Sequence, residues 1–174
     1  YWKGVQIHQF LSRTFLIPKP HQPNESRMLV GMKESGLNAV LTCEVFKQEG
    51  ISDVKEISKP GDYAIKLDLK NAYYQTLVIP QLRRQLRTKV LDVDRNLLVV
   101  LQYRGGSQGA KPIPEKFTKQ LRGLQRQFRA LGIRLVIKID DVLILAQSSE
   151  LCLLHTYIVI RVTAYLGCVW KLEK

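Results

Sequence analysis

Two adjacent acids, Asp140 and Asp141, lie inside an otherwise apolar stretch that runs from Ile133 to Leu145. Burying unpaired carboxylates is so costly that a chain keeps them in such a stretch only where something compensates their charge. A bound divalent cation is the usual compensation. A second strand-like segment, residues 63–69, carries a lone Asp68 in the same setting. Three carboxylates on two strands therefore predict a centre for two-metal phosphoryl chemistry.

The chain is strongly basic. Its 174 residues contain 27 Lys and Arg against 15 Asp and Glu, which gives a net charge of +12 at neutral pH. This charge favours a polyanionic partner, namely DNA, RNA or an anionic membrane, or membership of a basic assembly of the ribosomal kind. No apolar run has the length of a bilayer span, since Arg161 interrupts the best candidate, residues 157–170. We therefore expect a nucleic acid as the partner and no membrane.

The alternation of apolar and polar residues predicts two strands that carry the acids. In residues 63–69 the apolar side chains fall on one face, and Lys66 and Asp68 fall on the other. Residues 133–139 alternate in the same phase, which places Asp140 on the more polar face of a second strand. Both acids are therefore expected on the polar surface of a sheet.

The acid doublet is expected at a tight hairpin. Asp141 would form the turn, and residues 142–145 would form the returning strand. If the strands that carry Asp68 and Asp140 are neighbours in one sheet, these two carboxylates meet on one surface. The three acids would then form a single cluster.

The remaining pattern predicts an α+β fold. A hairpin is expected from residues 5–19 and 27–32, because a polar, proline-bounded turn separates the two segments. Helices are predicted at residues 51–58, 116–131 and 149–166. The longer two would pack on one face of an antiparallel sheet, with the acids on the other face. The stripes expected to be buried are Phe117, Leu121, Leu124, Phe128 and Leu131 in one helix, and Leu151, Leu154, Ile158, Val162 and Tyr165 in the other.

The opposite side of the 116–131 helix is basic. Such a side is most often simply solvated, but in a chain of this charge it is also a candidate contact for a phosphate backbone. Its residues are Lys116, Lys119, Arg122, Arg126 and Arg129.

Two segments of the chain resemble the motifs of one enzyme family. Residues 60–73 read PGDYAIKLDLKNAY, and residues 132–148 contain IRLVIKIDDVLIL. In this order, with about 70 residues between the acids, they are similar to the motifs of retrotransposon-type reverse transcriptases. The resemblance extends from about Phe10 to Lys174. It implies a polymerase palm over residues 61–174, a small fingers-like hairpin region over residues 1–60, and no thumb.

The resemblance implies an RNA-directed DNA polymerase that transfers nucleotides onto a primer 3′-hydroxyl. Asp68 would bridge two Mg²⁺ ions (with Mn²⁺ as an alternative), Asp140 would complete the catalytic pair, and Asp141 would play a weaker third role. Tyr73 would lie beneath the incoming sugar and select deoxynucleotides. The implied partners are an RNA or DNA template-primer and deoxynucleoside triphosphates.

Four further residues match positions with substrate roles in the family. Lys19 and Arg27 fall where the fingers offer basic residues to the triphosphate. Gly109 falls in the loop that supports the template base. Lys174 matches a lysine that assists the leaving group.

The chain also departs from the family pattern. Lys138 stands where an aromatic residue is usual, residues 104–114 retain little of the expected loop motif, and Asn71 replaces an acid. Lys138 shares a face with Asp140 at about 6–7 Å along the strand, where its ammonium would compete with magnesium or grip a primer phosphate. Two hypotheses follow: an active polymerase, or a catalytically weakened palm that serves as an RNA-binding or structural subunit of a larger ribonucleoprotein assembly.

Overall fold

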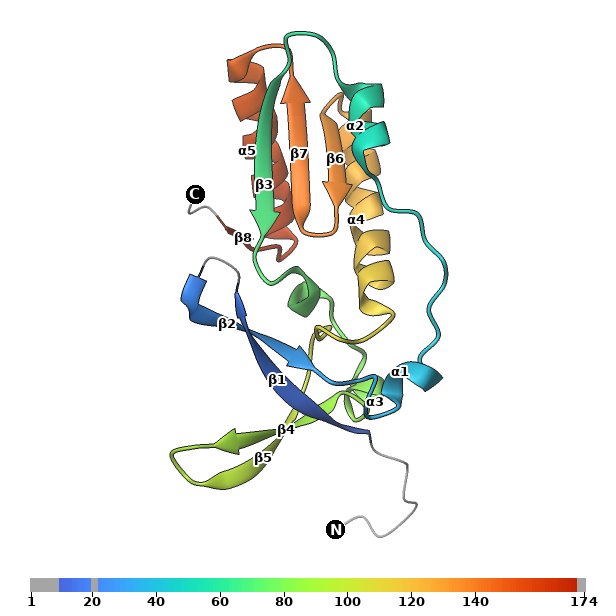
Figure 1. Ribbon diagram of the computed structural model, residues 1–174. Helices are drawn as coiled ribbons and strands as arrows, with labels where there is room; N and C mark the ends of the chain where they lie inside the picture. Colours follow the sequence, from blue (N-terminus) through green and yellow to red (C-terminus); the bar gives the residue numbers. More distant parts are fainter. Residues whose placement is uncertain (1–9, 20–21, 172–174) are drawn as a thin grey trace. The chain divides into compact units, whose positions relative to one another are not determined.

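The computed structural model describes residues 10–19 and 22–171, which have an α+β fold (Figure 1). Within these residues the fold contains five α-helices and two four-stranded sheets. The sheets are mostly antiparallel, and their parallel pairing joins β1 to β4. The α+β class predicted from the sequence is therefore confirmed.

The chain divides into two compact units. Unit 1 contains residues 1–44 and 76–113, and unit 2 contains residues 45–75 and 114–174. Residues 45–60, which the family resemblance grouped with the fingers-like segment, belong to unit 2. The chain passes from unit 1 to unit 2 and back before it ends in unit 2, so neither unit is one continuous segment.

Unit 1 is built on a sheet with the strand order β2-β1-β4-β5. The first two strands form the expected antiparallel hairpin, and the β4–β5 hairpin joins it through the parallel β1–β4 pair. The buried Thr88 hydroxyl donates to the carbonyl of Ser12 at 2.9 Å and so ties β4 to β1. The elements of this unit are β1 (Leu11–Lys19), β2 (Gln22–Val30), α1 (Leu37–Val40), α3 (Pro80–Arg83), β4 (Arg87–Asp92) and β5 (Leu97–Gln102).

Unit 2 is built on an antiparallel sheet with the order β6-β7-β3-β8. The predicted acid-bearing strands are present, but β7 lies between them, so β3 and β6 are not neighbours. The sequence pattern did not predict the two-residue β8 at the far edge. The strands are β3 (Tyr63–Leu69), β6 (Arg134–Lys138), β7 (Asp141–Ala146) and β8 (Trp170–Lys171).

Two long helices, α4 (Ile113–Ala130) and α5 (Ser149–Tyr165), cover one face of this sheet, and α2 (Ile51–Ile57) packs beside β6 (Figure 1). Apolar side chains from alternate strand positions and from both helices form one core. The opposite face carries the charged positions Lys66, Asp68, Lys138 and Asp141, together with Val136 and Leu145, which are buried outside this core. The buried core includes Leu69, Phe117, Leu121, Phe128, Leu135, Val142, Ile144 and Val159.

The α4 stripe is buried as predicted over most of its length, although Leu131 is exposed just beyond the helix. The prediction for α5 was wrong, since Leu151, Leu154, Val162 and Tyr165 are exposed. The physical reason is that α5 is apolar on nearly every side, so residue spacing alone fits more than one face. Smaller side chains pack against the sheet instead, namely Cys152, Thr156, Val159 and Thr163.

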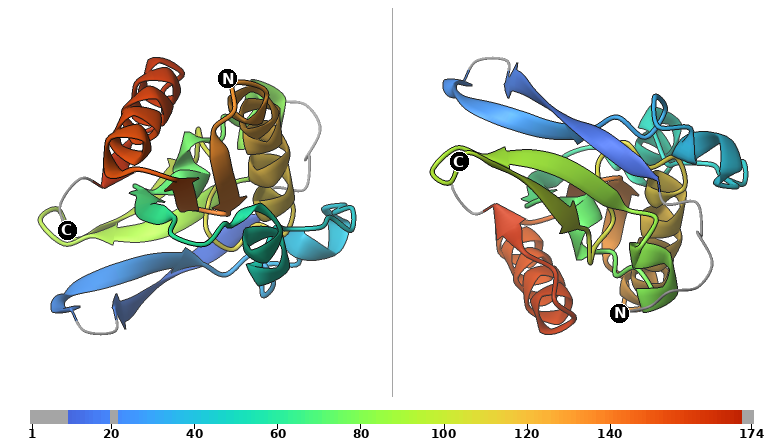
Figure 2. Two further views of the ribbon diagram at one scale, coloured as in Figure 1. Left: turned by 90° about the horizontal axis from the view of Figure 1, so that it is seen from above. Right: turned by 90° about the horizontal axis from the view of Figure 1, so that it is seen from below.

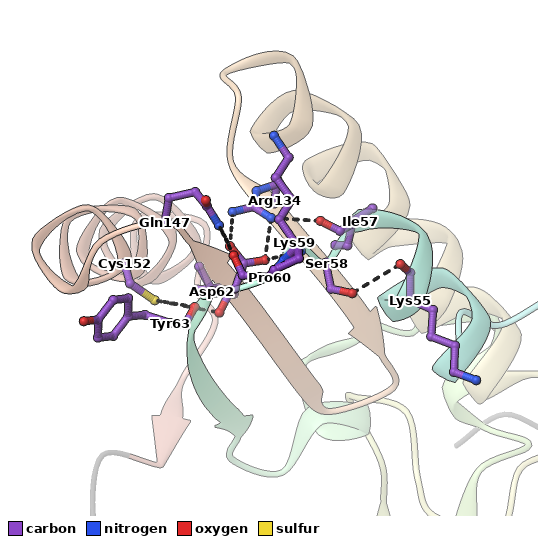
Figure 3. Close-up of polar contacts among 11 residues, drawn as sticks. Lys55, Ile57, Ser58, Lys59, Pro60, Asp62, Tyr63, Arg134, Gln147 and Cys152 are labelled. Atoms are coloured by element: carbon purple, nitrogen blue, oxygen red, sulfur yellow. Dashed lines mark hydrogen bonds and ion pairs between the residues drawn. The ribbon is translucent and has the colours of Figure 1, made fainter.

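A polar network closes the end of the sheet where β3 begins (Figure 3). Arg134 donates through both terminal nitrogens to the two carboxylate oxygens of Asp62, at 2.6 and 2.5 Å. The same carboxylate accepts from the backbone N–H of Lys59 at 2.7 Å and from the amide of Gln147 at 2.5 Å. Arg134 also donates to the carbonyl of Ile57 at the end of α2. The network therefore joins α2, β3, β6 and the segment before α5.

Candidate active site at the end of strand β3

Four charged residues form one row across the sheet of unit 2. Lys138 is paired with Asp141, Asp141 with Asp68, and Asp68 with Lys171. Directly opposed residues of antiparallel strands point to the same face, with Cβ atoms about 4.5–5.5 Å apart. Because the neighbouring Leu67 and Leu69 point into the core, this row lies on the face opposite the helices. The fold thus places two carboxylates side by side between two lysines.

Asp140 lies next to this row, in the turn that joins β6 to β7. Strand β6 ends at Lys138 and β7 begins at Asp141, so the two turn residues are Ile139 and Asp140. The expectation that Asp141 forms the turn and Asp140 ends a strand was wrong by one position. The backbone carbonyl of Asp140 accepts from the N–H of Leu69 at 2.8 Å, which fixes the turn against the end of β3.

The turn carries backbone strain. Ile139 has a φ of 57°, in the left-handed region. A β-branched residue is rare there, and a two-residue hairpin turn normally has glycine at its first position when that position needs a positive φ. Strain of this kind costs about 1–3 kcal/mol and is concentrated at functional sites. This strain has no signal in the sequence, since an isoleucine before an acid doublet fits an extended strand equally well.

Each of the two row carboxylates has a lysine partner. Lys171 Nζ lies 2.8 Å from Asp68 Oδ2, and Lys66 Nζ lies 2.9 Å from Asp141 Oδ1. The hydrogen bond and charge of Asp141 raise the pKa of Lys66, with smaller contributions from the charges of Asp68 and Asp140. All three aspartates therefore act electrostatically on one ammonium group. Both lysines are well exposed, and exposed pairs of this type are weak.

The lysines that pair with the site's carboxylates are Lys66 and Lys171, and not Lys138 as expected. Among the described residues Lys138 forms no ion pair with Asp140, although it lies opposite Asp141. Lys66 was placed on the acid-bearing face by its alternation, but its partner is Asp141 across the strands rather than Asp68. Lys171 had no signal in the sequence, because its approach to Asp68 depends on a two-residue strand more than 100 positions away.

Tyr73 lies in the 3₁₀ turn Ala72–Gln75, which follows β3 directly. Its ring packs edge-on against Phe117, with ring centroids 6.0 Å apart and an interplanar angle of 87°. Burial raises the pKa of the Tyr73 hydroxyl, and the negative charge of Asp140 raises it further. The tyrosine therefore shares the electrostatic environment of the acid cluster, and its ring is held in place by the α4 core.

The donor set matches a hard divalent cation in chemical type, since Mg²⁺ and Mn²⁺ prefer carboxylate oxygens. Within residues 10–19 and 22–171, however, no group of three or more His, Cys, Asp or Glu side chains is arranged to hold a metal. The ion pairs explain why the carboxylates do not converge on one point, because Asp68 and Asp141 direct their oxygens at Lys171 and Lys66. A cation at this site would have to replace those two ammonium groups.

The other residues predicted to contact substrate belong to unit 1 or lie outside the described residues. Lys19 ends β1 and the exposed Arg27 lies in β2, opposite Ile17. Lys174 is outside the described part of the chain. The roles of these three residues at a triphosphate or leaving group stay predictions.

Gly109 has a structural explanation of its own. Its φ is 113°, and a Cβ atom at this position would collide with the carbonyl oxygen of Val30. Its own carbonyl accepts from the side-chain amide of Asn38 at 2.8 Å. Glycine is thus required for the close packing of two backbone segments within unit 1, whatever its part in template binding.

The basic side of α4 is mostly engaged within unit 2. Lys116 and Lys119 contact the buried Glu115 at 3.2 and 2.8 Å. Arg122 donates to the carbonyl of Lys47, and Arg129 pairs with Glu49 at 2.9 Å. These contacts reduce the positive charge that this side offers to a phosphate backbone.

Comparison with protein-family models finds no match to this chain, and comparison with curated proteins finds no significant match. No helix among the described residues combines the length and the apolar character that a membrane crossing requires.

Proposed function

We propose that unit 2 is the palm of a reverse transcriptase-like nucleotidyltransferase. The observation that carries the proposal is the register of β3 and β7, which sets Asp68 opposite Asp141 and brings the Asp140 turn to the end of β3. The strained Ile139 in that turn and the adjacent Tyr73 support a functional centre at this point. The motifs IKLDLKNAY and IKIDDVLIL lie on these same strands and turns.

In this proposal Asp68 and Asp140 hold the divalent ions, with Asp141 as a weaker ligand. Bound Mg²⁺ would lower the pKa of the primer 3′-hydroxyl and stabilise charge on the leaving pyrophosphate. Tyr73 presents a rigid ring edge to the incoming sugar, because its packing on Phe117 restricts its motion. Lys66 and Lys171 lie on the same face, where their charges favour the approach of a phosphate group.

A second candidate function is a non-catalytic palm that binds RNA or supports a larger assembly. The observation that favours it is the pairing of both row carboxylates with lysines. The altered loop at residues 104–114 points the same way. In this case the charge of +12 would serve backbone binding, and affinity for RNA would fall steeply with salt concentration.

Primer extension distinguishes the two functions. The protein is incubated with an RNA template, a DNA primer, deoxynucleotides and Mg²⁺ or Mn²⁺, beside the variants Asp68→Asn and Asp140→Asn. We expect incorporation by the wild type and a loss of about a thousandfold or more in both variants, since several kcal/mol of transition-state stabilisation is removed. Asp94→Asn, an exposed acid in the β4–β5 turn, is the matched control and should retain activity.

Folded wild-type protein that binds RNA without extending the primer would reject the polymerase and favour the second function. Equal extension by Asp68→Asn and wild type would show that the proposed centre is not the catalytic one. Circular dichroism of each variant confirms that the fold is retained before activities are compared.

A further inference from the structure

Figure 2 shows α5 with one side against the sheet of unit 2 and no other described element of that unit on its far side. On that far side the helix has an unusually apolar set of exposed side chains. Its buried side consists of Cys152, Thr156, Val159 and Thr163. On the opposite side the exposed fractions reach 53% for Leu154, 60% for Tyr157 and 92% for Tyr165. A helix that is apolar all round is normally buried, and a continuous exposed stripe of this kind marks an interaction surface.

The exposed side of α5 carries one line of side chains that has a charged residue at each end. Successive positions at spacings of four, three and four residues are Glu150, Leu154, Tyr157 and Arg161. At 100° per residue these side chains fall within about 60° of one another on the helix surface, so they form one line. The line is acidic at one end, basic at the other and apolar between them.

Neither charge has a partner of opposite sign in the part of the chain that the structure describes. Glu150 accepts a hydrogen bond from the hydroxyl of Ser149 at 3.1 Å, and the Arg161 guanidinium lies over the ring of Tyr157 at 5.9 Å. Within the described residues neither group forms an ion pair. The separation of Glu150 and Arg161 along the helix axis is eleven residues, or about 16.5 Å.

This line is complementary to itself when reversed. If two α5 helices lie antiparallel and are centred between residues 155 and 156, Glu150 faces Arg161 of the other copy, and Leu154 faces Tyr157. The same two contacts recur on the other side of the two-fold axis, as an isologous interface requires. Each charge then has a partner of opposite sign, and the apolar side chains between the charges are buried from solvent.

We propose that this protein forms a two-fold symmetric dimer through antiparallel pairing of α5 with α5 of a second copy. The self-complementary order of the charges favours a second copy over an unrelated apolar partner, because both charges would otherwise lie unpaired at the edge of a desolvated surface. One helix face per subunit is smaller than a standard protein interface, so the dimer is weak and dissociates on dilution. The inference is independent of the proposed catalytic function.

Sedimentation velocity of the whole chain between about 5 and 500 µM tests the dimer. We expect the weight-average mass of the wild type to rise toward twice the monomer mass. Arg161→Glu brings two carboxylates together in each cross-helix pair, and Glu150→Arg brings two guanidinium groups together, so each variant alone should remain monomeric. Mixed in equal amounts, these two variants should form a heterodimer, because each cross-helix pair then joins a carboxylate to a guanidinium group.

The double variant Glu150→Arg with Arg161→Glu should also restore self-association. Arg126→Glu, which makes the same charge change on an exposed position of α4, is the matched control and should still dimerise. Thermal unfolding checks that each variant is folded. A wild type that stays monomeric at the highest concentration would overturn the proposal, as would a dimer that survives Arg161→Glu or a double variant that stays monomeric.

Discussion

The two ends of the unit 2 sheet hold their carboxylates in opposite ways. At the start of β3, the Asp62 side chain is 6% exposed and its Arg134 partner 22% exposed. At the end of β3, the Asp68 side chain is 19% exposed and its Lys171 partner 47% exposed. Six residues of strand, or about 20 Å, separate the two acids. One pair is therefore enclosed and the other is open to solvent.

The partners differ as well as the exposure. A guanidinium binds both oxygens of a carboxylate in a fixed plane, whereas an ammonium is a point charge on a flexible stem. Asp62 accepts from Arg134, Gln147 and the backbone of Lys59, so its oxygens are fully occupied. Among the described residues the Asp68 side chain pairs with Lys171 alone, so its carboxylate retains free lone pairs. The comparison indicates that the Asp62 ion pair is a permanent part of the structure. The Asp68 carboxylate, in contrast, can exchange its lysine partner for a cation.

The largest expected effect is the loss of the enclosed pair. In Asp62→Asn the Arg134 guanidinium stays in place without its counter-ion, which is the costly way to break a shielded ion pair. We expect the Tm, measured by circular dichroism at pH 7, to fall by about 5 °C or more. Asp94→Asn, an exposed acid in unit 1, should change the Tm by less than about 1 °C.

The pH dependence of the same variant sharpens the prediction. Arg134 holds the pKa of Asp62 far below its ordinary range, mainly through its hydrogen bonds. The stabilisation is therefore complete above the unfolded-state pKa of about 3.9 and is lost as the pH falls below that value. The Tm difference between wild type and Asp62→Asn should be constant from pH 8 to 5 and should shrink toward pH 3. A difference that persists unchanged at pH 3 would contradict the assignment.

A moderate effect on the affinity for a divalent cation is expected at the open end, where Asp68 pairs with Lys171. Lys171→Gln removes the ammonium that occupies Asp68, so a divalent cation no longer has to displace it. Exposed ion pairs contribute up to about 1 kcal/mol, and we expect the affinity for Mn²⁺, measured by electron paramagnetic resonance, to rise by about threefold to fivefold. Lys138→Gln is the matched control, because Lys138 lies in the same row but, among the described residues, forms no ion pair with Asp140 or Asp141. An equal rise in both variants would show a general effect of charge instead.

Lys66, the partner of Asp141, allows a finer test of whether a cation can replace a lysine at this site. Lys66 and Asp141 are both more exposed than Lys171 and Asp68, so solvent screens their attraction more strongly. In the same titration Lys66→Gln should raise the Mn²⁺ affinity by about twofold, which is less than Lys171→Gln does. The opposite order would mean that Asp141, rather than Asp68, is the principal ligand.

The sequence predicted the parts of this comparison that depend on local patterns. Strict alternation placed Asp68 on the face away from the core, and helix periodicity identified Phe117, Leu121 and Phe128 as buried. The N-terminal hairpin and the helix near residues 51–58 are also confirmed. These features depend on neighbours within one or two turns or strands, which the order of residues records directly.

The rest depends on long-range pairing. The position of β7 between β3 and β6 decides that Asp68 meets Asp141, and nothing near either residue specifies that order. The partners Lys171 and Arg134 lie more than 70 positions from the acids they contact. The face that α5 buries was undetermined, since leucines and tyrosines lie on several sides of it, and contacts such as Trp170 Nε1 to Thr163 Oγ1 select the smaller residues.

The smallest expected effect concerns His155, which lies on α5 near the enclosed end. Burial lowers the pKa of its imidazole, and the positive charge of Arg134 lowers it further. The folded protein therefore resists protonation, and the unfolded chain binds the proton more readily below its ordinary pKa of about 6.5. Stability from this source is present above that pH and is lost as the pH falls through it.

The substitution His155→Gln removes this titration. At pH 8 we expect the Tm of the variant to lie within about 1 °C of the wild type, because the neutral imidazole and the amide are both uncharged. Between pH 7 and 5 the wild type should lose about 1–2 °C more than the variant. This window lies above the one in which Asp62 acts, so the two contributions separate in a single series of melts. An equally steep decline in His155→Gln would mean that the enclosed end does not sense pH through this histidine.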